Sequence, residues 1–288
     1  MKILLTGVTG YIGNAVMKYL LSQGHEVHGL VRREIQVLNP ELHYHLLTDD
    51  NLKSLIGFIK PDCVVHIASL FLAAHKYEDI HNLISSNILF PTQLLEAMAE
   101  NGVTRLINTG TSWQHYDSEE YNPVNLYAAT KQSFEDIVKY YVMAKGFSCI
   151  TLKIYDSYGP SDSRGKLISL LDRLAKTQEK LDMSPGEQMI DLIHIDDICR
   201  AYGIAVDMLC KQSESYITSF GLYSENAVSL KELAKIYESA NQCQLNINWG
   251  GREYREREVM HPANNLMILP GWKPEIPLEE GIKLSNRY

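Results

Sequence analysis

The sequence predicts an α/β fold: a doubly wound parallel sheet with a smaller, interwoven α/β region toward the C-terminus. Over the first two-thirds of the chain, short runs rich in β-branched residues alternate with longer segments of helical apolar spacing. A glycine-rich turn joins the first run to the first of these segments. Such alternation is typical of parallel strands whose connecting helices cover both faces of the sheet. A sheet of this kind binds its ligands at the carboxyl ends of its strands.

The elements expected in the sheet follow one another along the chain. The strands are Lys2–Leu5, Glu26–Val31, His43–Leu47, Cys63–Ile67, Arg105–Asn108 and Ser148–Ile154. The helices between them are Ile12–Gln23, Asn51–Ile59, Ile84–Glu100 and Tyr127–Lys145.

After Gly159-Pro160 this alternation gives way to helices interleaved with short strands and charged loops. The helices expected there are Leu167–Lys176, Asp197–Leu209 and Leu230–Ala240. We expect residues 1–160, with part of 191–220, to form the sheet domain. Residues 161–190 and 221–288 are expected to form a region that covers the substrate.

Composition excludes several classes of partner. The net charge of -8 disfavours a broad nucleic-acid or anionic-membrane surface, because both need a basic face. The five cysteines are scattered and form no CxxC pair, which indicates reduced thiols and no metal or disulfide site. No apolar stretch approaches membrane-spanning length, and the first apolar run is too short for a signal peptide. We therefore expect a cytoplasmic protein with a small-molecule substrate.

The glycine-rich turn is Gly7-Val8-Thr9-Gly10-Tyr11-Ile12-Gly13, between the first strand and the first helix. A phosphate can approach a backbone closely only where Cβ atoms are absent, and a helix N-terminus offers N–H groups to it. A tight turn without a ligand is the alternative. The strand–turn–helix setting favours a dinucleotide held by Gly7, Thr9, Gly10, Tyr11, Ile12 and Gly13.

Arg32 and Arg33 end the second strand. A site specific for NAD would have an acidic residue here to bind the ribose hydroxyls, whereas arginines suit the 2′-phosphate of NADP. A solvated basic turn is the alternative. The sequence thus favours NADP (as NADPH), with NAD as the second choice.

Tyr127 and Lys131 lie one helical turn apart on the same face of a predicted helix. The charge of the lysine is expected to lower the pKa of the tyrosine and make it a usable acid or base. Tyr141 and Lys145 repeat this spacing fourteen residues further on, about 21 Å away along the helix. Only Tyr127 comes at the ligand end of the sheet, so Tyr141 is assigned to packing.

Hydroxyl groups follow the fifth strand, in the stretch Asn108-Thr109-Gly110-Thr111-Ser112-Trp113-Gln114-His115-Tyr116. At the carboxyl end of a strand they can hydrogen-bond a substrate oxygen beside Tyr127. Capping of the strand end by Ser or Thr is the alternative. His115 is interpreted as structural.

Taken together, these residues resemble the extended short-chain dehydrogenases/reductases, the NAD-dependent epimerase/dehydratase group that acts on nucleotide sugars. The resemblance runs nearly end to end. It includes the glycine turn, Pro61-Asp62-Cys63-Val64-Val65-His66-Ile67-Ala68, Asn87, Tyr127/Lys131, Tyr158-Gly159-Pro160, Asp191-Leu192-Ile193-His194-Ile195-Asp196-Asp197, Gly271-Trp272-Lys273-Pro274 and Leu278-Glu279-Glu280-Gly281. It implies a Rossmann fold, with Ala68 beside the cofactor.

The resemblance also implies a Ser/Thr–Tyr–Lys triad. Counting back from Tyr116 gives Ser112 as the hydroxyl, with Thr111 as second choice and a substrate contact. Tyr127 would then exchange a proton with a sugar oxygen, while Lys131 binds the nicotinamide ribose.

Further substrate contacts follow from the same resemblance. Asp156 stands where many members have an asparagine, and Arg255 or Arg257 would clamp the nucleotide diphosphate. A solvated run of alternating charge is the alternative for the two arginines. Leu46 stands where many members have an aspartate that contacts the adenine, which leaves the cofactor contacts there open.

The departures from the family pattern narrow the activity. Trp113-Gln114 replaces the Asp-Glu pair with which the 4,6-dehydratases eliminate water, so a dehydratase is disfavoured. The chain is more similar to the NADPH-dependent 4-keto-deoxysugar reductases of the CDP-abequose and CDP-paratose synthase type. A nucleotide-sugar 4-epimerase with tightly bound NAD is the alternative. A non-catalytic dinucleotide-binding regulator is a third, disfavoured because the triad is intact. The resemblance implies a homodimer formed through a four-helix interface.

Overall fold

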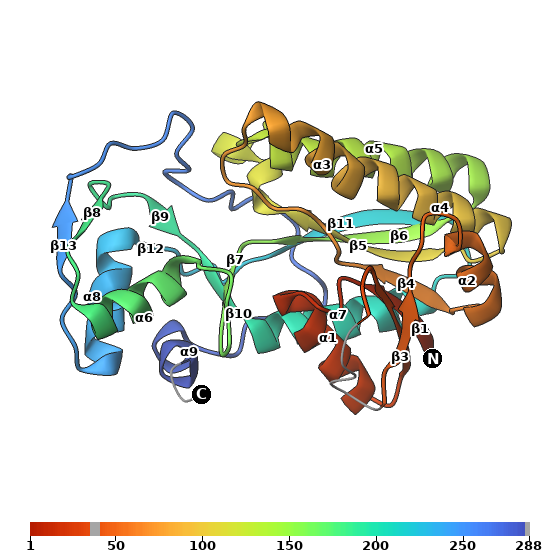
Figure 1. Ribbon diagram of the computed structural model, residues 1–288, viewed down its shortest axis with the longest axis horizontal. Coiled ribbons are helices and arrows are strands. Elements are labelled where there is room, and N and C mark those ends of the chain that lie inside the picture. The colour runs from red at the N-terminus through yellow and green to blue at the C-terminus, as the bar shows by residue number, and fades with distance from the viewer. Residues whose placement is uncertain (35–40, 286–288) are drawn as a thin grey trace.

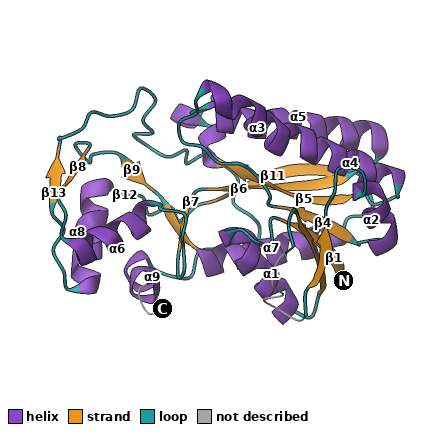
Figure 2. Cartoon of the chain, viewed as in Figure 1, coloured by secondary structure: helices purple, strands orange, loops and turns teal. Residues whose placement is uncertain are grey.

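A seven-stranded parallel sheet forms the centre of the molecule (Figures 1 and 2). The computed structural model describes residues 1–34 and 41–285. The strands lie side by side in the order β11-β6-β5-β4-β1-β2-β3. Their bounds are β1 Lys2–Thr6, β2 Glu26–Val31, β3 His43–Leu46, β4 Cys63–His66, β5 Arg105–Thr111, β6 Ser148–Ile154 and β11 Tyr216–Leu222. The predicted fold class is confirmed.

Helices cover both faces of this sheet, which explains why central strands such as β4 and β6 are buried at every residue. One face packs against α1 (Tyr11–Ser22) and α7 (Ile195–Cys210). The other packs against α2 (Leu52–Ile59), α4 (Phe90–Glu100) and α5 (Leu126–Lys145). Each face therefore has an apolar core of its own.

The order of the strands reverses beside β1. From β1 the chain builds outward to β2 and β3, and then returns to place β4 on the other side of β1. The connections leave opposite faces of the sheet at such a point, so a crevice opens at the carboxyl ends of β1 and β4.

The predicted helix Ile84–Glu100 differs from the observed structure. The helical segment begins earlier, with α3 (Ile80–Ile84), and continues through a π-helical turn at Ser85–Leu89 into α4. Pro91 is the second residue after this turn and has no N–H to donate to the carbonyl of Asn87, four residues earlier. A break in the α-helical hydrogen-bond pattern is the expected result, and π-turns of this kind occur often at functional sites.

The remaining elements form a smaller region beside the carboxyl edge of the sheet, on the left in Figure 1. Its elements are β7 Asp156–Tyr158, α6 Leu167–Thr177, β8 Leu181–Met183, β9 Met189–Ile190, β10 Leu192–His194, β12 Val228–Ser229, α8 Leu230–Asn241, β13 Ile247–Trp249 and α9 Leu278–Ser285. The strands pair two by two, and α6, α8 and α9 enclose a third apolar core. Because α7 and β11 return to the sheet between these elements, the two regions are interwoven.

None of the helices in the described part of the chain is both long enough and apolar enough to cross a membrane.

Candidate active site

A cavity of about 1470 Å³ opens at the carboxyl edge of the sheet. Its wall includes the glycine turn, the end of β2, the turn after β4, the end of β5 and the first turn of α5. Pockets for one small molecule are typically about 300–1,000 Å³. The cavity therefore has room for a dinucleotide and part of a second ligand.

The glycine turn packs against the end of β4 more closely than side chains would allow. Gly7 has φ +80°, and a Cβ atom on it would lie 2.8 Å from the backbone nitrogen of Ala68. A Cβ atom on Gly13 would lie 2.0 Å from the carbonyl oxygen of Gly7. Gly10 is the N-cap of α1 and has no side chain to accept from the first N–H groups of the helix. These residues fit the pyrophosphate of a dinucleotide.

The residues predicted to bind the cofactor lie together in this wall, with two exceptions, Arg33 and Lys131. Those that line the cavity are Gly7, Thr9, Gly10, Tyr11, Ile12, Gly13, Arg32, Ala68 and Tyr127. Arg33 is exposed and lies outside the lining. The sequence did not single out Asp49 and Asp50, which also line the cavity beyond β3.

Asn87 fixes the turn that follows β4. Its side chain accepts from the backbone nitrogen of Leu70 at 2.8 Å and donates to the carbonyl oxygen of Leu70 at 2.9 Å. It also donates to Thr130 Oγ1 in α5 at 3.0 Å. Asn87 is buried within the π-helical turn. One amide thus connects the cavity wall, the π-turn and the helix that carries Tyr127.

Asn125 begins α5 and so positions Tyr127 in its first turn. Its Oδ1 accepts from the backbone nitrogen of Ala128 at 3.0 Å, which is the N-cap geometry. Tyr127 lines the cavity, and its ring meets the edge of Phe71 at 5.0 Å between centroids.

Burial raises the pKa of Tyr127 to about 12, against a smaller lowering by a hydrogen bond with the Ser69 side chain. The prediction that Lys131 lowers the pKa of Tyr127 is therefore wrong for this structure. The physical reason is that loss of hydration penalises the phenolate more than its surroundings stabilise it.

Lys131 lies one turn deeper in α5, fully buried beneath the cavity wall and outside its lining. Burial lowers its pKa to about 8, and the nearby carboxylate of Glu135 opposes this shift. Burial, with a contribution from Lys131, lowers the pKa of His66 to about 3, so this imidazole is neutral at pH 7. His66 Nδ1 lies 2.8 Å from Thr6 Oγ1.

Strand β5 extends further than predicted into the hydroxyl-bearing stretch 108–116, here called the hydroxyl loop. Thr109-Gly110-Thr111 still pairs with β6. Ser112–Gln114 then forms a short 3₁₀ turn, in which Thr111 Oγ1 accepts from the backbone nitrogen of Trp113 at 3.3 Å. Thr111, Ser112 and Trp113 all line the cavity beside Tyr127.

Gln114 points away from the cavity and is fully buried. Its Oε1 accepts from the backbone nitrogen of Thr111 at 3.0 Å, and its Nε2 donates to Gln132 and Glu135 at 2.8 Å each. His115 is buried behind the same loop, with Nε2 2.7 Å from Lys153 Nζ. These side chains support the loop from behind, and only Trp113 of the Trp113-Gln114 pair faces the cavity.

Of the residues predicted to contact the substrate through the family resemblance, the structure places Asp156 in the cavity wall and the two arginines outside it. Asp156 lines the cavity, 3.7 Å from Lys166 Nζ. Arg257 lies over the ring of Tyr116 at 4.3 Å and donates to Asn122. Both Arg255 and Arg257 are exposed, and neither lines the cavity.

Other cations do line the cavity, among them Arg164 and Lys166. The sequence reasoning missed them, although both follow Gly159-Pro160 soon after the sixth strand, where ligand contacts are expected. The guanidinium of Arg164 lies over the ring of Tyr11 at 4.3 Å, beside the glycine turn. A guanidinium, paired with Asp162 at 2.6 Å, therefore lies near the place where phosphates would bind.

Comparison with known proteins places these features in context. The model of the NAD dependent epimerase/dehydratase family matches residues 3–216. CDP-abequose synthase from Salmonella muenchen is 28% identical, over 98% of this chain and 96% of its own. CDP-abequose synthase from Yersinia pseudotuberculosis is 29% identical, over 91% and 92%. The structure of UDP-glucose 4-epimerase from Thermotoga maritima with UDP-glucose superposes with a TM-score of 0.86 at 21% identity, covering 99% of this chain and 97% of that one. At this identity the structural likeness shows the fold alone.

Proposed function

Because the chain belongs to the NAD dependent epimerase/dehydratase family, we propose that it reduces the 4-keto group of a nucleotide-activated deoxysugar with NADPH. One observation carries the proposal. Ser112 and Tyr127 line the cavity while Trp113 takes the place of an acid or base for elimination, and Gln114 is turned into the protein. The wall can hold and protonate a carbonyl oxygen, while neither Trp113 nor Gln114 has an acid or base with which to remove water. The full-length similarity to CDP-abequose synthases supports a nucleotide sugar as substrate.

The reaction assigns a separate task to each side chain. Bound NADPH would supply the hydride to the carbonyl carbon. Tyr127 would donate its phenolic proton to the carbonyl oxygen, to which the Ser112 hydroxyl also donates a hydrogen bond. With a pKa of about 12 Tyr127 holds this proton at neutral pH, as a general acid must. The ammonium group of Lys131, one turn below, would stabilise the tyrosinate that forms.

The cofactor contacts favour NADPH over NADH. Arg32 lies in the cavity wall at the end of β2, where a 2′-phosphate would find a guanidinium partner. We propose that the glycine turn holds the pyrophosphate and that Asp156, Arg164 or Lys166 contacts the sugar nucleotide. Arg255 and Arg257 could reach the same ligand only if the loop that carries them moved.

One assay tests the proposed function. Purified protein is given NADPH, or NADH in a parallel series, with a panel of nucleotide 4-keto-deoxysugars, and absorbance of the reduced nicotinamide is followed. Stoichiometric loss of NADPH with formation of a 4-hydroxy product supports the reductase. Interconversion of nucleotide sugars without added NADPH overturns it in favour of a 4-epimerase. Dinucleotide binding with no turnover on any member of the panel would indicate a regulator.

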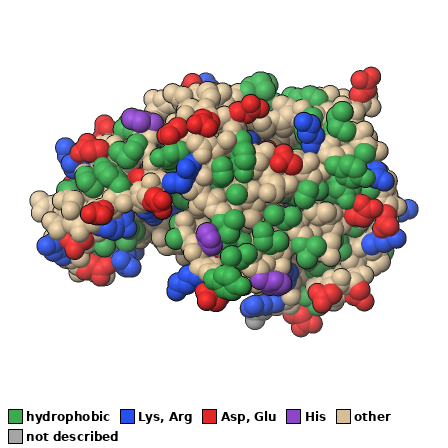
Figure 3. All heavy atoms as spheres, turned by 90° about the horizontal axis from the view of Figure 1, so that it is seen from above, with side chains coloured by type: hydrophobic (Ala, Val, Ile, Leu, Met, Phe, Trp, Pro, Cys, Tyr) green, Lys and Arg blue, Asp and Glu red, His purple; other side chains and the backbone are tan. Residues whose placement is uncertain are grey.

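We also propose that the protein forms a homodimer through α4 and α5. Seen from above, apolar side chains gather over the half of the molecule that holds these helices (Figure 3). Exposed apolar residues are Tyr140 and Met143 in α5, and Ile80, Ile84 and Leu89 in the helical segment that leads into α4. Apolar side chains gathered on an exposed face are typical of an interface. Sedimentation velocity should show a dimer for the parent and a monomer for Met143→Glu; a monomeric parent would contradict the proposal.

A further inference from the structure

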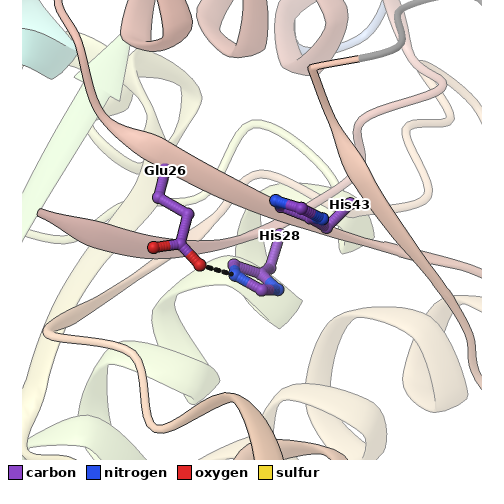
Figure 4. Close-up of side chains that lie close together, drawn as sticks. All are labelled: Glu26, His28 and His43. Atoms are coloured by element: carbon purple, nitrogen blue, oxygen red, sulfur yellow. Dashed lines mark hydrogen bonds and ion pairs between the residues drawn. The ribbon is translucent and has the colours of Figure 1, made fainter.

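A cluster of imidazoles lies on the outer two strands of the sheet, on the face that packs against α2, α4 and α5. In the parallel register of β2 and β3, His28 is directly opposite His43. His45 follows His43 by two residues, and Glu26 precedes His28 by two. Because side chains alternate along a strand, all four lie on the same face (Figure 4 shows three of them).

The contacts within this cluster are short. His28 Nε2 lies 2.8 Å from Glu26 Oε1, and His28 Nδ1 lies 2.8 Å from His45 Nε2. The ring of His28 stacks on that of His43, with centroids 4.8 Å apart. One ligand atom from each of Glu26, His28 and His43 lies within 4.8 Å of the other two.

Small side-chain movements would bring these atoms to the separations of a metal site. Zinc bonds to imidazole nitrogen and carboxylate oxygen at about 2.0–2.2 Å in a tetrahedron, which places neighbouring ligand atoms about 3.3 Å apart. Glu26 is half exposed and His43 is exposed, so both side chains can turn toward an ion without disturbing the core. Water can complete the coordination at this open surface.

We propose that Glu26, His28 and His43 bind a divalent transition-metal ion of the zinc type, with His45 holding the His28 ring in place. The site is separate from the candidate active site, since none of the four side chains lines that cavity. Two nitrogen ligands and one oxygen suit zinc, nickel or copper, whereas magnesium and calcium prefer oxygen ligands alone.

The two hydrogen bonds of the His28 ring indicate which proton a metal ion would displace. The ion takes the place of the proton between His28 Nε2 and Glu26 Oε1, and that proton leaves to solvent. His28 Nδ1–H then donates to His45 Nε2, the second contact that commonly orients a metal-bound imidazole.

Metal binding would join two strands. β3 is a four-residue strand at the edge of the sheet, and among the described residues it pairs with β2 alone. A ligand that binds the folded chain stabilises it by mass action, and here the bond would link residues on both strands. We therefore expect zinc to raise the melting temperature.

The test titrates Co²⁺ into chelator-treated full-length protein and follows its visible absorption, then displaces it with Zn²⁺. One saturable site is expected, with no thiolate-to-cobalt charge-transfer band, which excludes the cysteines. His43→Ala and Glu26→Gln should each abolish the site, and His45→Ala should weaken it by about 10–100-fold. The matched control is His75→Ala, an exposed histidine outside the cluster, which should bind as the parent does.

Thermal unfolding keeps the proposal falsifiable if a variant is less stable. Zn²⁺ should raise the melting temperature of the parent and of His75→Ala, and leave that of His43→Ala unchanged. Absence of saturable binding to the parent overturns the proposal. So does binding that persists in both His43→Ala and Glu26→Gln, or a spectrum with a thiolate band.

Discussion

Tyr127 and Lys131 lie one helical turn apart, and burial moves their pKa values in opposite directions, to about 12 and about 8. Each shift disfavours the charged form, as expected where hydration is lost. The tyrosine therefore keeps its proton as it waits for substrate. The lysine loses its proton under mildly alkaline conditions, so the charge of the pair changes with pH in this range.

We expect kcat for the proposed reduction to fall as the pH rises through about 8. Below this pH Lys131 keeps its ammonium charge and can stabilise the tyrosinate; above it the side chain becomes neutral. The measurement is kcat against pH at saturating NADPH and substrate. In Lys131→Arg the alkaline fall should disappear, because a guanidinium stays charged beyond about pH 12. An unchanged alkaline limb in this variant would show that another group is titrating.

Removing the phenolic hydroxyl of Tyr127 should remove the proton donor and leave the fold intact. Tyr127→Phe keeps the edge contact with Phe71, so dinucleotide affinity should be unchanged while kcat falls by about 10²–10⁴-fold. Tyr141→Phe is the matched control, since that hydroxyl donates to Glu96 at 2.7 Å, distant from Tyr127 along α5. Steady-state kinetics and a dinucleotide titration measure both effects. An active Tyr127→Phe enzyme would show that the site is wrongly assigned.

At the scale of elements, the π-helical turn links the cofactor half of the cavity to the catalytic helix. Asn87 is the contact that does so, with bonds to Leu70 and Thr130. Asn87 was identified from the sequence through the family resemblance alone. Pro91, four residues later, does not indicate which groups the Asn87 side chain contacts. A hydrogen-bond partner 43 residues away cannot be read from local spacing.

Asn87→Ala should destabilise the protein and weaken dinucleotide binding together. The partly buried backbone groups of Leu70 and the buried hydroxyl of Thr130 would lose a partner, at a total cost of about 1–3 kcal/mol in free energy of unfolding. KM for NADPH should rise, because the turn after β4 lines the cavity. Urea unfolding and steady-state kinetics test this. Asn101→Ala, which removes amide bonds at the far end of α4, should lower stability and leave KM unchanged; equal KM in both variants would contradict the assigned role.

For the whole molecule, Asp197 connects the C-terminal segment to the sheet domain. This fully buried carboxylate, in the first turn of α7, accepts from the backbone nitrogens of Glu275 and Ile276 at 3.2 Å each. It also pairs with Arg200 at 2.7 Å, and its carbonyl oxygen accepts from Trp272 Nε1. Two motifs far apart in the sequence thus meet at one residue. We propose that residues 1–160 with part of 191–220, and 161–190 with 221–288, act as the two lobes joined there.

Asp197→Ala should lower the free energy of unfolding by about 3 kcal/mol. This is the lower end of the range for a broken buried ion pair, because Arg200 is partly exposed and still lies near Glu275. Chemical denaturation measures the loss. Asp196→Ala removes the neighbouring, largely exposed carboxylate and should change stability little. Similar losses in both variants would show that the connection through Asp197 contributes nothing specific.

Much of the fold and part of the site could be predicted from local pattern. The bounds of β2 and β6 agree with prediction to the residue, because both strands are rich in apolar and β-branched residues and are buried at all positions but the first of β2. The glycine turn was also predictable, because the backbone of Gly7 lies so close to Gly13 that no residue with a Cβ atom fits there. Lys166 was missed because its place in the cavity depends on how the smaller region folds back on the sheet.

The sequence by itself determined the fold class, the strand–turn–helix cradle and the spacing of Tyr127 and Lys131, since all of these depend on neighbours along the chain. Only the tertiary structure decided which side chains face the cavity and which support it. Gln114 and Trp113 are adjacent in sequence and point to opposite sides. It also brought Glu26, His28 and His43 together, because strand register sets distances across a sheet. Burial, which decides pKa values, is likewise a property of the packed molecule and not of the residue.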